Sequence, residues 1–139
     1  MTVMTREMLQ DFLAAEFPQV KGQGFTVDEV SDDHIIVHMQ TDDKDLRPGG
    51  TVSGPTMMSL VDVSMYLLLL AQIGPVALAV TTSLNMNFLR KPLPGLLRAE
   101  GKLLKLGKLL ATGEISIYSE GVGKPVAHAT VTYAIPPAK

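Results

Sequence analysis

One long apolar run, from Thr56 to Ile73, constrains the fold of this 139-residue chain more than any other segment. It follows the glycine-rich segment 49–55 (GGTVSGP), and Asp62 is its only charged residue. A carboxylate that leaves water loses hydration free energy unless it gains a partner or a chemical task. We therefore expect Asp62 to mark a functional site.

The signals for helix termini predict a helix over this run. Ser53 or Gly54 is a suitable N-cap, and Pro55 fits the first helical turn, where its missing N–H has no helical partner. The helix should end near Gln72, before Gly74. Because the run is apolar on nearly every side, we expect other elements to enclose this helix.

The remaining sequence predicts a short helix and six strands. Residues 5–17 begin with a capping threonine, carry apolar residues on one face and end at Pro18, which indicates an amphipathic helix. Alternating patterns and turn residues predict strands over 25–30, 34–41, 80–89, 97–106, 109–118 and 126–134. Two strands, a buried helix and four consecutive antiparallel strands indicate one α+β domain over residues 1–139, with a sheet wrapped around the central helix.

Composition excludes several classes of function. The chain has no cysteine, so disulfides and thiolate chemistry are excluded, and its net charge of −2 gives no attraction to nucleic acid. His34 and His38 lie about 13 Å apart along one strand, too far to share a metal, and a surface position is the default for His128. The N-terminus lacks a secretory signal, and Asp62 interrupts the longest apolar run. We therefore expect a cytoplasmic protein without a membrane, nucleic acid, metal or cofactor.

The segment 50–55 (GTVSGP), followed by Leu60, Val61 and Asp62, resembles the Gly-Thr-x-His-Gly-Gly signature and downstream aspartate of the hotdog-fold thioesterases. The resemblance is to the phenylacetate-degradation branch, and segments 82–90 (TSLNMNFLR) and 104–108 (LKLGK) are also similar to it. It covers about residues 26–133, and its most specific part is the eight-position step from Gly54 to Asp62. The resemblance implies a hotdog fold and hydrolysis of an acyl-CoA or another acyl thioester.

The resemblance also implies roles for individual residues. In the family, the backbone N–H of the glycine matching Gly54 polarises the thioester carbonyl, and the aspartate matching Asp62 is the nucleophile or the general base. A helix N-terminus suits the first role, because free N–H groups and the helix dipole favour an oxyanion there. Thr81 matches a hydroxyl residue that orients water in some relatives. Further candidate substrate contacts by position are Asn87, Arg90 and Lys108, the last two for CoA phosphates.

Three residues near the signature differ from the family pattern and are candidate substrate contacts. The branch usually carries histidine where Ser53 stands, glycine where Pro55 stands and asparagine where Arg47 stands. Serine does not hold a proton near neutral pH as imidazole does. Proline removes one N–H, which leaves Gly54 and Thr56 as candidate donors. Arg47 is a permanent cation that could pair with the aspartate or with an acidic acyl group.

The spacing of the two principal residues predicts a dimer. Eight residues of helix separate Gly54 and Asp62 by about 12 Å, too far for both to touch one carbonyl. The two roles therefore require two copies of the chain, with Asp62 of one facing Gly54 of the other across an antiparallel helix pair. We expect a homodimer, and pairing of dimers into tetramers stays open.

Other interpretations remain. A hydratase or dehydratase acting on acyl thioesters would need a histidine beside the carboxylate, and a non-catalytic acyl-thioester binder is also compatible with the departures from the pattern. Asp62 could be a structural carboxylate and Ser53 only a helix cap. A serine nucleophile is disfavoured, because Ser53 lacks both glycines of the Gly-x-Ser-x-Gly elbow. The apolar lining favours aryl or medium-chain acyl groups.

Overall fold

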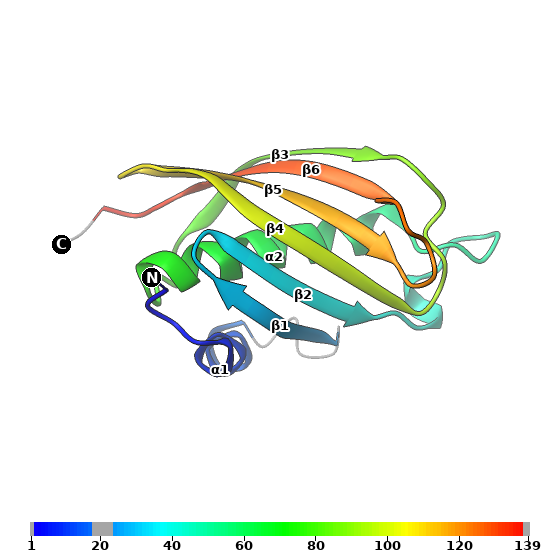
Figure 1. Ribbon diagram of the computed structural model, residues 1–139, viewed down its shortest axis with the longest axis horizontal. Coiled ribbons are helices and arrows are strands. Elements are labelled where there is room, and N and C mark those ends of the chain that lie inside the picture. Colours follow the sequence, from blue (N-terminus) through cyan, green and yellow to red (C-terminus); the bar gives the residue numbers. More distant parts are fainter. Residues whose placement is uncertain (1, 18–23, 138–139) are drawn as a thin grey trace.

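The structure, a computed structural model, describes residues 2–17 and 24–137. An antiparallel sheet curves around helix α2 (Gly54–Ile73), and helix α1 (Arg6–Glu16) lies beside the first strand (Figure 1). The strands are β1 (Phe25–Ser31), β2 (His34–Gln40), β3 (Val80–Phe88), β4 (Leu96–Leu106), β5 (Leu110–Ser119) and β6 (Ala127–Ala134). The predicted α+β architecture is confirmed, and every predicted strand end lies within one residue of the observed one.

Helix α1 forms where its cap and apolar face predict it. The Thr5 hydroxyl accepts a hydrogen bond from the Met8 N–H at 3.2 Å, and Leu9 and Leu13 are buried. Its predicted end at Pro18 lies outside the described residues. The helix covers apolar surface at the β1 edge and takes no part in the candidate site.

Helix α2 is enclosed only along its C-terminal half. Every residue from Val63 to Ala71 is buried, and Gly74, with φ of 102°, ends the helix by donating its N–H to the Leu70 carbonyl at 2.8 Å. By length and composition alone α2 could cross a membrane, but 67% of its apolar window is buried against the fold. The expectation of an enclosed helix is wrong for one stripe of the first three turns, where Pro55 and Met58 are exposed and Asp62 is half-buried, because no element of the same chain covers this stripe.

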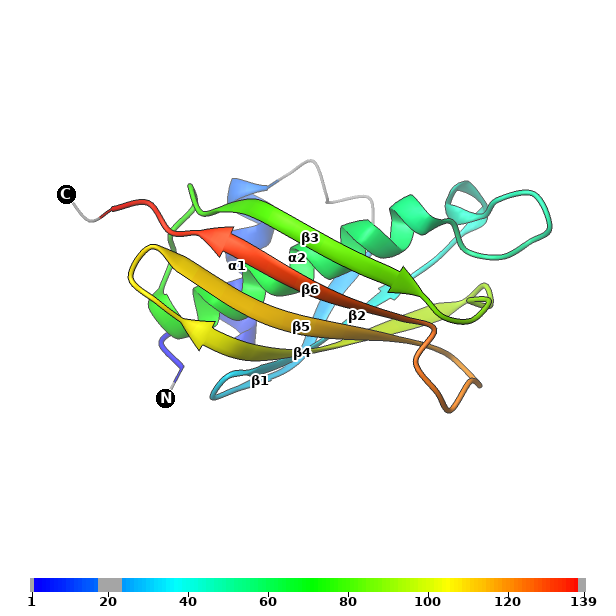
Figure 2. The same ribbon diagram turned by 90° about the horizontal axis from the view of Figure 1, so that it is seen from above.

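The order of strands across the sheet is β1-β2-β4-β5-β6-β3, and every neighbouring pair is antiparallel. Of the four strands expected to be consecutive, β4, β5 and β6 do follow one another, but β3 lies beside β6 and not beside β4. After α2 the chain first forms β3 at the edge beside β6, and only then returns to place β4 next to β2 (Figure 2). Within the described chain, the other edge of β3 has no strand beside it, which leaves its backbone groups open to a second chain.

A bulge in β3 decides which side chains face the helix. Thr81 pairs with Tyr133 on β6, but Ser83 pairs with Thr132, so β3 contains one extra residue at this point. Strict alternation would place Thr81 on the outer face with Ser83 and Asn87. The bulge instead turns Thr81 toward the helix, where it reaches Asp62.

Candidate active site

Asp62 is held by two hydroxyl groups that come from neighbouring strands. Thr81 on β3 donates to Asp62 Oδ1 at 2.5 Å, and Tyr133 on β6 donates to the same oxygen at 2.9 Å. The Tyr133 hydroxyl also lies 3.2 Å from the Asp62 backbone carbonyl. These groups, rather than Arg47, are the partners of the carboxylate in the described chain.

Tyr133 was missed by the sequence analysis. Burial and, next in size, the Asp62 carboxylate raise the pKa of Tyr133 well above its ordinary value, so the phenol keeps its proton and acts as a donor. Its ring packs against Tyr66 with 6.0 Å between centroids. The inward alternation of Ala127, Ala129 and Val131 would have placed Tyr133 on the buried face, but sequence alone does not place it against Asp62.

Gly54 offers a free backbone donor at the start of α2. The Thr56 N–H donates to the Ser53 hydroxyl at 3.3 Å and the Met57 N–H to the Ser53 carbonyl at 3.2 Å, whereas the Gly54 N–H has no acceptor in the described part of the chain. The expectation of Thr56 as a second oxyanion donor is therefore wrong, because the helix cap already uses its N–H. Of the two candidate donors, Gly54 alone keeps an N–H without an acceptor in the described residues. The space beside its Cα is filled by the Phe88 ring, 3.4 Å from an ideal Cβ.

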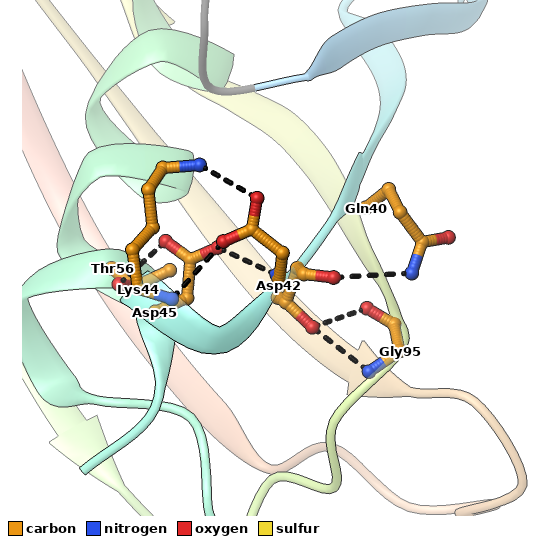
Figure 3. Close-up of polar contacts among 7 residues, drawn as sticks. Gln40, Asp42, Lys44, Asp45, Thr56 and Gly95 are labelled. Carbon is orange, nitrogen blue, oxygen red and sulfur yellow. Dashed lines mark hydrogen bonds and ion pairs between the residues drawn. The ribbon is translucent and has the colours of Figure 1, made fainter.

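A buried aspartate that the sequence analysis did not single out stabilises this helix start. Asp45 is only 6% exposed and accepts hydrogen bonds from the Asp42 N–H at 2.9 Å and the Thr56 hydroxyl at 3.3 Å (Figure 3). The Ser53 hydroxyl donates to the Thr56 hydroxyl at 2.9 Å, which extends the chain of hydrogen bonds to the cap. Ser53 is thus a structural cap here. The sequence signal for this buried aspartate was the Asp-x-x-Asp pattern of a capping box, from Asp42 to Asp45.

A positively charged cleft opens at the same end of α2. Its volume is about 580 Å³, and three cations line it, Arg47, Arg90 and Lys91, together with Gly54 and Phe88. None of the residues that the structure places in its lining is acidic. Arg47 sits in a tight turn, where the Gly50 N–H donates to its carbonyl at 3.0 Å. The cleft therefore favours an anionic ligand near the Gly54 N–H.

The other predicted site residues lie apart from this cleft within one chain. Asp62 is absent from the lining of the cleft. Pro55 follows Gly54 in the sequence and is exposed, but it is not part of the lining either. Lys108 lines a different cavity of about 900 Å³ beside Ile73, at the opposite end of α2. Asn87 pairs with His128 on the outer face of the sheet. A single chain thus brings Gly54, Arg47 and Arg90 together, and keeps Asp62 with Thr81 elsewhere.

Comparisons with known proteins agree with this architecture. The family model of the thioesterase superfamily matches residues 49–126. The chain is 46% identical to a protein from Silicibacter sp. TM1040 that is provisionally described as a thioesterase; the match covers 99% of this chain and 95% of that chain, with a TM-score of 0.90.

Two further solved structures share the fold. The phenylacetic acid degradation protein PaaI from Thermus thermophilus is 26% identical, over 86% of this chain and 99% of that chain, with a TM-score of 0.75. A protein from Streptococcus mutans, solved bound to acetyl-CoA, is 23% identical over 84% of this chain and 92% of that chain, with a TM-score of 0.73. A search of curated proteins gave no significant match. On the family model and the 46% identity, this chain belongs to the thioesterase superfamily.

Proposed function

We propose that this protein hydrolyses acyl-CoA thioesters to a free acid and CoA at a site that two copies of the chain share. One observation carries the proposal: the two halves of the site lie over opposite ends of the same open edge strand. Gly54 packs against Phe88 at the end of β3, and Asp62 is bonded to Thr81 near its start. A second copy paired along that edge supplies the missing half.

The geometry of β3 predicts how the two copies meet. Antiparallel pairing of β3 with a second β3 about its midpoint at Leu84 places Val80 of one copy opposite Phe88 of the other, with Thr81 next to this pair. The same twofold axis brings Asp62 to Gly54 of the second copy. The exposed stripe of α2 through Met58 then becomes the contact between the two helices. This geometry supports the homodimer, and an active monomer in sedimentation would contradict it.

The chemistry follows from this pairing. The Gly54 N–H polarises the thioester carbonyl, and the Asp62 carboxylate of the other copy takes a proton from water as the water oxygen adds to the carbonyl carbon. The tetrahedral oxyanion collapses, the C–S bond breaks, and the leaving thiolate takes the proton from Asp62. In the direct route, Asp62 attacks the carbonyl carbon, the thiolate leaves, and water cleaves the resulting anhydride. Both routes consume one water and give one acid and one thiol.

The cleft supports an anionic thioester as substrate. Arg47, Arg90 and Lys91 give it positive charge, while Phe88 supplies apolar wall. The acetyl-CoA complex of the Streptococcus mutans protein is a case in which this fold holds a CoA thioester.

The histidines disfavour the hydratase alternative. His38 is bonded to Asp28 at 2.7 Å and His128 to Glu114 at 3.0 Å, while His34 contacts a backbone carbonyl in the β1–β2 turn. None of them touches Asp62 of the same copy, so one chain offers no imidazole beside its own carboxylate to share proton transfer.

The test is thiol release from a panel of acyl-CoA substrates with aliphatic and aryl acyl groups. We expect Asp62→Asn to lower kcat by roughly 10²-fold to 10⁴-fold, the range for loss of a general base. The matched control is Asp43→Asn, an exposed acid in the loop before α2, which should retain full activity. Unchanged turnover in Asp62→Asn would remove Asp62 from the mechanism, and binding without turnover by the wild type would favour a non-catalytic binder.

A further inference from the structure

Both hydroxyl donors at Asp62 bind the same carboxylate oxygen. Thr81 and Tyr133 donate to Oδ1 at 2.5 and 2.9 Å, and no residue in the described ranges is bonded to Oδ2. A carboxylate has about four lone-pair sites, two on each oxygen. The two donors therefore occupy Oδ1 and leave Oδ2 with both lone pairs free.

We infer that Oδ2 of Asp62 is the reacting oxygen, and that Tyr133 is the positioning residue that selects it. The inference rests on the proposed function and adds to it a residue outside the family motif. In the water route, Oδ2 gives its electron pair to a proton of water; in the direct route, it gives the pair to the carbonyl carbon. Oδ1 keeps its two hydrogen bonds throughout and fixes the orientation of the carboxylate.

Four features make Tyr133 a rigid support. Its side chain is buried, with 4% of the residue exposed, and its ring packs against Tyr66 at 6.0 Å. Its hydroxyl contacts the Asp62 backbone carbonyl at 3.2 Å as well as Oδ1, which ties the carboxylate to the helix backbone. It pairs with Thr81 across the sheet, so the β3 bulge and the β6 register aim both donors at one atom.

Both phenols near the carboxylate keep their protons and remain hydrogen-bond donors. The titratable groups nearest to this cluster are Tyr133 and, behind it, Tyr66. Burial raises the pKa of both phenols, Tyr66 with a further contribution from Glu16 on α1. Neither phenol therefore loses its proton in the range where a carboxylate titrates.

The experiment compares Tyr133→Phe with Tyr66→Phe. Both changes remove one hydroxyl and keep the ring, but the Tyr66 hydroxyl donates to the Ala77 carbonyl at 3.1 Å and not to Asp62. We expect Tyr133→Phe to lower kcat about tenfold with KM nearly unchanged, as for loss of one hydrogen bond to a charged group. Tyr66→Phe should keep the wild-type kcat. Equal kcat values for all three proteins would overturn the inference.

A second measurement separates this inference from the proposed function. The Asp62 side-chain ¹³C carboxyl resonance, measured at one neutral pH, reports on the hydrogen bonds of the carboxylate and needs no turnover. A resonance that shifts in Tyr133→Phe, but not in Tyr66→Phe, supports the positioning role even if the wild type hydrolyses none of the thioesters. A resonance that does not shift overturns the role even in an active enzyme.

Discussion

Thr81 reaches Asp62 at 2.5 Å although strand alternation assigns its side chain to the opposite face of the sheet. The β3 bulge makes this contact, since one extra residue before Ser83 reverses the facing of the residues that precede it. Bulges often re-aim a side chain beside an active site. The bulge in β3 therefore interrupts the regular strand pairing and places the Thr81 side chain beside Asp62.

Replacing Thr81 with valine should slow hydrolysis while leaving the fold intact. Valine keeps the shape of the side chain but removes one of the two donors to Oδ1, so we expect kcat to fall about tenfold, as for loss of one hydrogen bond to a charged group. The control is Thr82→Val, whose hydroxyl donates to the Thr132 carbonyl at 3.2 Å. Equal activity in both variants would show that the contact between Thr81 and Asp62 does not matter for turnover.

Local sequence patterns predict the helices and strands, whereas the contacts between these elements become visible only in the folded structure. Ser53 and Pro55 mark the helix start, and the solitary charge of Asp62 marks the site, because each depends on neighbours a few positions away. The pairing of β3 with β6, the bulge and the approach of Tyr133 to Asp62 join segments separated by up to 71 positions. No short-range pattern encodes such a contact.

Asp45 illustrates the same limit inside a loop. The polar residues around it indicate only a connecting loop, yet this carboxylate is buried because the α2 cap needs an acceptor there. Asp45→Ala would leave the Asp42 N–H and the Thr56 hydroxyl without their partner, so we expect a loss of about 1–3 kcal/mol in the free energy of unfolding. Chemical denaturation measures this loss. The control is Asp43→Ala at the exposed neighbouring position, which should change the free energy of unfolding by less than about 0.5 kcal/mol. Equal losses in the two variants would contradict the role of Asp45 as a buried acceptor.

Arg47 should contribute to substrate binding through its charge. We expect Arg47→Gln to raise KM for acyl-CoA about threefold, in the range of an exposed ion pair, and the effect should shrink at high salt. Arg98→Gln is the control, because Arg98 is bonded to Glu100 at 2.8 Å and stacked on Tyr118, away from the cleft.

The same variant also identifies which part of the substrate Arg47 meets. If it meets the CoA phosphates, thioesters of uncharged N-acetylcysteamine should show the same KM in wild type and Arg47→Gln. If it meets an acidic acyl group, the KM for N-acetylcysteamine thioesters should rise only when the acyl group carries a carboxylate. No change with any substrate would exclude Arg47 from binding.

Met58 lies halfway between Gly54 and Asp62 on the exposed stripe of α2, and 42% of the residue is exposed. If Asp62 faces Gly54 of a second copy, the twofold axis passes beside Met58, and the two Met58 side chains meet. Helices packed about 8–10 Å apart, with Cα atoms about 2.3 Å from each axis, bring facing Cα atoms to about 3.4–5.4 Å. That range overlaps the separation of about 4.4–6.8 Å that a disulfide spans.

The absence of cysteine from the sequence makes this geometry directly testable, because Met58→Cys introduces the only thiol of the chain. Mild oxidation should convert this variant into a covalent dimer on a non-reducing gel, and the reduced form should keep its activity. Ala15→Cys, exposed on α1, should stay monomeric on the same gel. A Met58→Cys protein that sediments as a dimer but forms no disulfide would show that the helices do not face each other. That result would contradict a site shared between Asp62 and Gly54 of two copies, whether or not the enzyme is active.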